Sequence, residues 1–352
     1  MSDAKLLIYG ANGYSGTMIS REARERGLEP VLAGRSRESV EKLGRDLDLP
    51  FRVFSLDDPG ALASELRGFR VLINCAGPFS ATARPMMDAC IETGVHYCDI
   101  TGEIDVFVEA HNRRQRAETA GVVVCPGVGF DVVPTDCLAA KLKEALPDAN
   151  RLALGFDSRS GMSPGTAKTS IEGLARGGKV RRGGKIVTVP LAYRTRPIDF
   201  GDGEKLAMTI PWGDVATAYY TTGIPDIDVY IPASPRLVSR LKKMNWVRPL
   251  LGLAAVQNFM KKRVDRSVKG PTAEQRARLS TALWGEVVNP AGHIRTARFT
   301  TANGYTVTAN AAVSISQYLL KCEGVAGALT PSQLMGADFA FGLPGSSELE
   351  WL

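Results

Sequence analysis

The chain has 352 residues, and its 43 Lys and Arg against 37 Asp and Glu give a formal net charge of +6. A hydrophobic content of 44% and a charged content of 23% are ordinary for a globular protein and exclude collagen-like, disordered and disulfide-scaffold classes. The length predicts two domains. The six cysteines form no CxxC pair and we find no signal-peptide pattern, so we expect free thiols and a cytoplasmic location. Three widely separated histidines predict no metal site.

Short apolar runs alternate with helical patterns over the first 125 residues. This alternation is typical of βα units and predicts an α/β fold, a Rossmann-like doubly wound parallel sheet. We expect strands at 5–9, 30–34, 51–55, 70–76, 95–99 and 122–125, and helices at 14–26, 36–48, 84–93 and 101–121.

The turn after the first strand has the sequence GANGYSG. Its glycines stand where the backbone must turn, approach a pyrophosphate and pack the following helix on its strand. Free N–H groups at the start of that helix bind an anion. We therefore expect cofactor contacts from this turn, at Gly10, Asn12, Gly13, Tyr14, Ser15 and Gly16.

The end of the second strand indicates which cofactor binds. An NAD enzyme normally has an acidic residue here for the ribose 2′-hydroxyl. This chain has Arg35, Ser36 and Arg37 and no nearby carboxylate. Guanidinium and hydroxyl groups bind a 2′-phosphate through charge-assisted hydrogen bonds, so we predict NADP(H).

Two further loops are expected near the cofactor. Asp57, after the third strand, either contacts the adenine or belongs to a helix start with Asp58 and Pro59, and both interpretations stay open. The fourth strand ends in NCAGPF, whose small residues let the backbone approach the ribose and nicotinamide. There we expect contacts from Cys75, Ala76, Gly77 and Pro78.

The loop after the fifth strand holds candidates for proton transfer. None of the nine tyrosines has a lysine four residues later, which excludes the proton relay of short-chain dehydrogenases. Tyr97 and Asp99 are candidate catalytic residues, since burial would raise the pKa of a carboxyl group. A structural role for Asp99 is equally open. Thr101 as a helix cap and Glu103 as a partner of that helix's dipole are favoured over catalytic roles.

The loop after the sixth strand, GVGFDVVPTD, ends at the same edge of the sheet. Gly129, Phe130 and Asp131 are expected to contact cofactor or substrate, and Asp131 is the third candidate catalytic residue. Asp136 is expected in the first turn of the next helix.

These motifs resemble those of the saccharopine dehydrogenase-like superfamily of NADP-binding oxidoreductases, in particular its branch of trans-acting enoyl reductases. The resemblance rests on GANGYSG (10–16), AGR (33–35), NCAGPF (74–79), HYCDITGE (96–103), PGVGFDVVPTD (126–136) and GALTPSQLMGADF (327–339). It implies an NADP-binding domain of residues 1–148 and 309–352, interrupted at 149–308 by an α/β substrate and dimerisation domain with a mixed sheet. Members act on imines, reduce enoyl groups for lipid synthesis, or associate with membranes.

Within the middle domain we expect strands at 151–157, 186–189, 227–230, 293–301 and 305–310. The run 175–185 predicts an exposed basic hairpin. The loop at 160–170 either holds an anionic substrate group with the help of Lys168 or is a plain helix start.

One segment, residues 236–269, holds most of the positive charge. Ten basic residues and one acid give it +9 and leave −3 for the rest of the chain. Its apolar centre at 246–260 is too short to span a membrane. Our first interpretation is an ordinary helix pair with a buried apolar face. An anionic membrane surface and an acidic acyl carrier protein are the alternatives, and we expect no nucleic acid.

Together these features predict an NADPH-dependent reductase that transfers a hydride to a C=C or C=N bond of a hydrophobic or carrier-linked substrate. We also expect a homodimer. The alternative is a non-catalytic NADP-binding protein associated with membrane or lipid, and a saccharopine-type imine dehydrogenase is the third interpretation.

Overall fold

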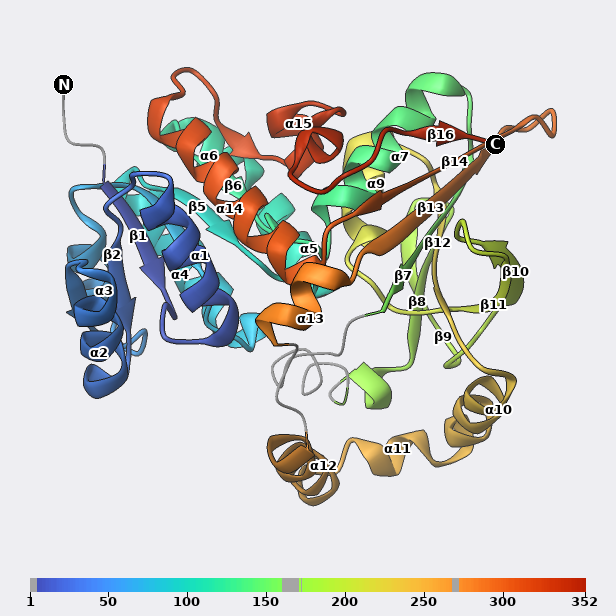
Figure 1. Ribbon diagram of the computed structural model, residues 1–352, viewed down its shortest axis with the longest axis horizontal. Coiled ribbons are helices and arrows are strands. Elements are labelled where there is room, and N and C mark those ends of the chain that lie inside the picture. Colours follow the sequence, from blue (N-terminus) through green and yellow to red (C-terminus); the bar gives the residue numbers. More distant parts are fainter. Residues whose placement is uncertain (1–4, 160–170, 172, 268–271) are drawn as a thin grey trace. The chain divides into compact units, whose positions relative to one another are not determined.

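The computed structural model describes residues 5–159, 171, 173–267 and 272–352 (Figure 1). Its contacts divide the chain into two compact units. The first consists of Met1–Val133 and Tyr305–Gly336, and the second of Pro134–Gly304 and Ala337–Leu352. The chain therefore passes between the units three times.

The first unit is built on a parallel sheet with the strand order β15-β6-β5-β4-β1-β2-β3. This order reverses direction at β1 and β4, which confirms the predicted doubly wound fold. The strands are β1 (Lys5–Tyr9), β2 (Val31–Gly34), β3 (Phe51–Val53), β4 (Phe69–Asn74), β5 (His96–Asp99), β6 (Val123–Cys125) and β15 (Gly327–Ala328). The helices are α1 (Tyr14–Glu25), α2 (Arg37–Leu47), α3 (Pro59–Leu66), α4 (Phe79–Thr93), α5 (Ile104–Asn112), α6 (Arg114–Ala120), α14 (Gly304–Lys321) and α15 (Pro331–Met335).

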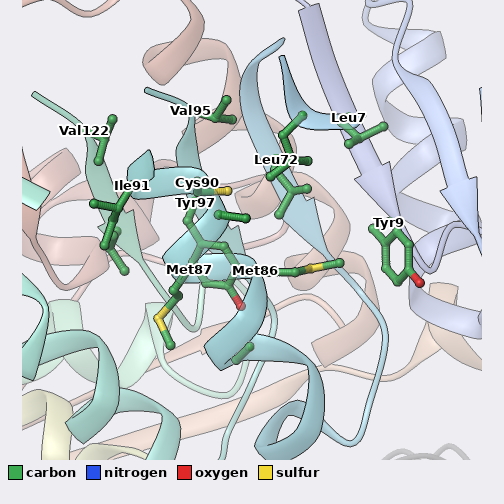
Figure 2. Packing of buried hydrophobic residues seen from close by; sticks show 14 of the residues in the cluster. Leu7, Tyr9, Leu72, Met86, Met87, Cys90, Ile91, Val95, Tyr97 and Val122 are labelled. Carbon is green, nitrogen blue, oxygen red and sulfur yellow. The ribbon is translucent and has the colours of Figure 1, made fainter. Parts of the chain in front are cut away.

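A large core cluster of this unit lies between its sheet and α3, α4, α5 and α6. β4 and β5 are almost fully buried, as strands covered on both faces should be. Figure 2 shows Met86, Met87 and Cys90 of α4 lying among side chains of the sheet, including Leu72 and Tyr97. This packing fixes the ends of β4 and β5, which bear the candidate site.

Two predicted elements of this unit are wrong. The helix expected over 101–121 is two helices, because the chain turns at Arg113, whose side chain is nearly buried in ion pairs with Asp88 and Glu109. The strand expected over 305–310 is the start of α14. Its alternation of small and polar residues resembles a strand, but residues 307–313 are all buried, as in a helix covered on several sides.

The second unit contains a mixed sheet with the order β10-β11-β12-β7-β13-β14-β16, and β8 pairs with both β12 and β9. Only the β7–β12 pairing among the described strands is parallel. The strands are β7 (Arg151–Ser158), β8 (Gly178–Arg182), β9 (Lys185–Val189), β10 (Thr195–Asp199), β11 (Glu204–Thr209), β12 (Asp226–Pro232), β13 (Thr281–Val288), β14 (Ile294–Thr301) and β16 (Glu350–Trp351). The helices are α7 (Val133–Ala145), α9 (Asp214–Thr222), α10 (Pro235–Met244), η1 (Asn245–Val247), α11 (Arg248–Leu251), α12 (Ala254–Ser267), α13 (Ala273–Arg278) and η2 (Phe339–Gly342).

The boundaries of the units differ from the predicted 1–148, 149–308 and 309–352. A Cβ at Gly285 of β13 would lie 2.6 Å from a methyl group of Leu142, so α7 packs directly on the second sheet. At the other end of the chain, β16 pairs with β14. Residues 134–148 and 337–352 therefore belong to the second unit.

Candidate functional site

Because the strands of the first sheet are parallel, the residues that follow them gather at its carboxyl edge. The predicted cofactor residues follow β1, β2, β3, β4 and β6, and the predicted catalytic residues lie at the end of β5 or after β6. The topology brings all of them to one edge of one unit.

The turn from β1 into α1 is closely packed. Gly10 has φ +74°, and a Cβ there would lie 2.8 Å from the backbone nitrogen of Ala76. A Cβ at Gly16 would lie 2.3 Å from the carbonyl oxygen of Gly10. Gly13 caps α1 without a side-chain hydrogen bond, and no acidic residue stands in the first turn. The start of this 12-residue helix therefore presents N–H groups and a positive dipole end to an anion.

The residues after β2 are open to solvent. Arg35, Ser36 and Arg37 are exposed, and within the described part of the chain neither arginine has a side-chain hydrogen bond or ion pair. Ser36 precedes α2, and its hydroxyl donates to that of Ser39. Both guanidinium groups can therefore meet a phosphate without breaking an existing contact.

A contact between Asp57, which follows β3, and the adenine stays a prediction. The residue that caps α3 is Asp58, whose side chain accepts from the N–H groups of Gly60 and Ala61. Asp57 itself is exposed and accepts from the hydroxyl of Ser55.

Asn74, the last residue of β4, orders the NCAGPF loop. Its Oδ1 accepts from the backbone N–H of Ala76 at 3.0 Å, and its Nδ2 donates to Thr82 Oγ1 at 3.1 Å and to the hydroxyl of Tyr97 at 3.4 Å. Thr82 donates to the carbonyl of Ala76 at 2.6 Å. The half-buried Cys75 is fixed by a backbone hydrogen bond to Tyr9. Gly77 and Pro78, joined by a cis peptide bond, lead into α4.

Asp99 extends this network to the next two loops. Its Oδ2 accepts from the Tyr97 hydroxyl at 2.8 Å, and its Oδ1 accepts from the N–H groups of Thr101 at 3.0 Å and Gly127 at 2.8 Å. The loops after β4, β5 and β6 are thus joined through one chain of hydrogen bonds, from Thr82 through Asn74 and Tyr97 to Asp99.

Tyr97 and Asp99 are both fully buried. Burial raises the pKa of Asp99 to about 6, although the three hydrogen bonds that it accepts act in the opposite direction. Burial, and then the neighbouring Asp99, raise the pKa of Tyr97 well above its ordinary value. In this structure the pair positions loops, and proton transfer by either residue stays a prediction.

The role of Glu103 differs from the one expected. It precedes α5, but its carboxylate accepts from the N–H groups of Phe79 and Ser80, both at 2.9 Å. It therefore complements the dipole of α4 rather than that of its own helix. Thr101 likewise makes a local turn, since its hydroxyl accepts from the N–H of Glu103 and does not cap α5.

Asp131 is a half-buried carboxyl group at the same edge. Its Oδ2 lies against Gly102, where an added Cβ would be 2.8 Å away. Burial raises its pKa to about 7. This pKa lets Asp131 hold a proton at neutral pH.

The first turns of α14 contact residues at the carboxyl edge of the first sheet. The hydroxyl of Thr308 accepts from the N–H of Phe130 at 3.0 Å, and a Cβ at Gly129 would lie 2.9 Å from the methyl group of Thr308. Tyr305 meets Tyr14 of α1 edge-to-face, with ring centroids 4.9 Å apart. Sequence reasoning missed Thr308 and Tyr305 because it placed a strand there. It also missed Thr82, in α4, and Asn74, whose signal was a polar residue at the end of an apolar strand.

The residues present fit a dinucleotide phosphate. The close contacts at Gly10 and Gly16 leave no room for a Cβ in the turn, α1 has an uncapped positive end, and two exposed arginines follow β2. The pyrophosphate would be held by the 10–16 turn and a 2′-phosphate by Arg35, Ser36 and Arg37.

The remaining predictions concern the second unit. Asp136 lies in the first turn of α7, as expected. The loop at 160–170, with Lys168, lies outside the described residues. The hairpin expected at 175–185 is found at 178–189, where β8 pairs with β9, whereas residues 175 and 176 are helical, and the hairpin is not wholly exposed. Arg181 is buried, donates to the carbonyls of Val215 and Gly184, and stacks on Tyr219.

The first interpretation of residues 236–269, a helix pair with a buried apolar face, is wrong. The exposed fraction is 90% for Trp246, 58% for Leu250, 54% for Leu253 and 66% for Phe259. Among the described residues, no helix is both long and apolar enough to cross a membrane.

Residues 6–125 match the family model of the saccharopine dehydrogenase NADP binding domain. A human saccharopine dehydrogenase-like oxidoreductase is 29% identical over 152 residues, which cover 37% of this chain and 35% of the human protein. The trans-acting enoyl reductase of Mycobacterium leprae is 29% identical over 141 residues, which cover 37% of this chain and 33% of that protein. The matched region thus spans about a third of the length of these curated relatives.

The fold is similar over nearly the whole chain to a solved structure, apo saccharopine dehydrogenase (L-Glu forming) from Saccharomyces cerevisiae. That likeness has a TM-score of 0.70 at 11% identity and covers 99% of this chain and 100% of the yeast chain. The family match confirms the NADP prediction made from the residues after β1 and β2. Residues 6–125 thus match an NADP-binding domain of the saccharopine dehydrogenase type, in a chain that is similar in sequence and fold to saccharopine dehydrogenase-like oxidoreductases.

Proposed function

We propose that the chain is an NADPH-dependent reductase that transfers a hydride to a C=C or C=N bond of a hydrophobic or carrier-linked substrate. The observation that carries the proposal is the half-buried carboxyl group of Asp131, which lies at the same sheet edge as the glycine-rich turn. A reduction of this kind needs a proton as well as a hydride, and Asp131 is a proton source with a pKa near 7.

The chemistry divides between cofactor and protein. When bound, the reduced cofactor supplies the hydride, which adds to the electrophilic carbon of the double bond. Asp131 gives its proton to the other atom of that bond, which is carbon in an enoyl group and nitrogen in an imine, and regains it from solvent. The hydrogen-bonded chain through Asn74, Tyr97 and Asp99 holds the three loops in place during this step.

The described part of the second unit favours a substrate without two carboxylates. Two cations of its sheet are already paired with carboxylates: Arg182 with Asp228 at 2.6 Å, and Arg196 with Glu286 at 2.8 Å. An amino-diacid would have to compete with these carboxylates. A substrate with an enoyl group, the group in the name of the mycobacterial relative, makes no such demand. The saccharopine-type imine reaction is therefore our lower-ranked proposal.

The test is NADPH oxidation, followed at 340 nm, against a panel of enoyl thioesters of increasing chain length and a panel of imines. We expect turnover with at least one hydrophobic enoyl thioester or imine. Tight NADPH binding without turnover on any of them would overturn the reductase proposal and favour a non-catalytic nucleotide-binding protein.

Asp131→Asn tests the proton source in the same assay. We expect NADPH affinity to be retained while kcat falls about 100-fold or more, because a neutral amide cannot donate the proton. In the parent protein, kcat should fall as the pH rises through 7, when Asp131 loses its proton. Asp46→Asn, at an exposed carboxylate on α2, is the control and should change nothing. Full kcat in Asp131→Asn would remove Asp131 from the reaction.

A further inference from the structure

The basic apolar segment, here residues 235–264, combines features that the reductase chemistry does not use. It forms α10, η1, α11 and most of α12. Twelve large apolar side chains are exposed among the described residues of the chain, and six of them fall between positions 237 and 259. They are Leu237, Trp246, Val247, Leu250, Leu253 and Phe259. Such a concentration marks an interaction surface.

The first helix of this segment is firmly attached to the second unit. Val238 is buried in a small cluster with Ala192 and Met208. Asn245 accepts from the N–H of Leu191 at 2.8 Å and donates to its carbonyl at 3.2 Å. One face of α10 is therefore packed against the second unit, while Leu237 of this helix and the five exposed apolar side chains that follow it along the chain are not.

Positive charge lies beside the exposed apolar side chains. Arg236, Arg240 and Lys243 are spaced by four and three residues, so they share one stripe of α10, where they line a shallow groove with Met244 and Val247. These three cations are exposed and form no ion pair within the described part of the chain. The sequence has eight basic residues and no acidic residue between positions 236 and 264.

The exposed apolar side chains and the cations together favour an anionic lipid surface over other binding partners. Trp246 lies in η1, Leu250 in α11, Leu253 between α11 and α12, and Phe259 in α12. All four are exposed, and such side chains can enter the boundary between headgroups and acyl chains. The cations beside them match lipid phosphates. A second copy of this surface would bring two strongly positive segments together, which is unfavourable.

We propose that residues 235–264 bind the surface of an anionic bilayer, with their helices lying on the membrane. The apolar side chains enter the interface, and the cations of α10 contact headgroup phosphates. This places the enzyme where an apolar substrate dissolves, but the proposal stands independently of the reductase chemistry.

The test is flotation of the full-length protein with vesicles. We expect flotation with 70% phosphatidylcholine and 30% phosphatidylserine at low salt, weak flotation with phosphatidylcholine alone, and loss of flotation at high salt, where charge attraction is screened. Replacing Arg236, Arg240 and Lys243 by glutamine should lower partitioning by about fivefold per cation removed. Trp246→Ser should lower it about tenfold.

Matched controls separate this surface from general charge or hydrophobicity. Trp351→Ser, at an exposed aromatic side chain of β16, should float like the parent protein. So should a triple glutamine variant at the exposed cations Arg21, Lys42 and Arg67. Because every substituted side chain is exposed, the melting temperatures should match that of the parent protein.

No flotation with anionic vesicles at low salt would overturn the proposal. Equal losses in the control variants would also overturn it. Retention on soluble polyglutamate without flotation would assign the surface to an acidic protein instead.

Discussion

Replacing Gly16 by alanine tests the packing that prepares the first unit for its cofactor. The added Cβ would lie 2.3 Å from the carbonyl oxygen of Gly10 and 2.9 Å from the Cα of Ala11, whereas real Cβ contacts essentially never fall below 3.0 Å. Both obstacles are backbone atoms, so the start of α1 must move about 0.7 Å, the difference between 2.3 Å and 3.0 Å. Overpacking costs about 1–3 kcal/mol, and the rigidity of the backbone places this variant near 3 kcal/mol. The melting temperature should therefore fall by about 6–12 °C.

Gly13→Ala is the matched control in the same turn. Gly13 has φ −75°, and its Cβ would meet only the carbonyl oxygen of Gly10, at 3.3 Å. This variant should melt within about 3 °C of the parent protein, yet bind NADPH more weakly because its methyl group stands where the pyrophosphate approaches. Circular dichroism reports the melting, and NADPH fluorescence reports the binding. Equal melting temperatures for Gly16→Ala and Gly13→Ala would refute the reasoning.

Two further substitutions test the cofactor preference and the buried carboxyl group. Arg35→Ala should weaken NADPH binding about tenfold or more and leave NADH binding unchanged, since only NADPH has a 2′-phosphate; equal weakening in a fluorescence titration would contradict the assignment. Asp99 has a pKa of about 6 in the folded protein and an ordinary pKa of 3.8. Its protonated form therefore favours folding, and this contribution to the free energy of unfolding is lost as the pH rises from about 4 to about 6. The loss is on the order of 3 kcal/mol. Asp99→Asn cannot ionise, so its cost in urea unfolding should be larger at pH 4.5 than at pH 7.5, and an equal cost at both pH values would show that Asp99 does not titrate in this range.

The first unit could be predicted from sequence because its signals are local. Short apolar runs bounded by glycine predicted β1, β2 and β5 within one or two residues, and the turn of residues 10–16 predicted the cofactor. Each signal lies within about 15 residues of chain. Parallel topology then brings the loops to one edge without further information.

The contacts that complete the site are long-range, and sequence could not reveal them. Glu103 looks like the start of its own helix, but its carboxylate stabilises α4, about 24 residues earlier. Thr308 reaches Phe130 across 178 residues of sequence. Nothing near Thr308 in the chain identifies that partner, and its alternating neighbours indicated a strand.

For the basic apolar segment, sequence predicted buried apolar side chains where the structure has exposed ones. Its amphipathic pattern suggested a buried apolar face, because burial is the usual fate of such a pattern. Only tertiary structure shows that Val238 is the one buried side chain among the described residues of this segment, while Trp246 and Phe259 are exposed. Periodicity identifies a helix face but does not identify what covers it.

The threefold passage of the chain between the units has a consequence for synthesis on the ribosome. The nucleotide-binding unit begins with β1, but Asn310, which accepts from Arg26 of that unit, and β15, its edge strand, are made more than 170 residues after β6. The emerging sheet must therefore wait, with one edge uncovered, while nearly all of the second unit is translated. A fragment that stops at Val133 would keep the glycine-rich turn and lose its partners on α14. The cofactor unit therefore begins to form before the second unit is made, and it is completed only after nearly all of that unit.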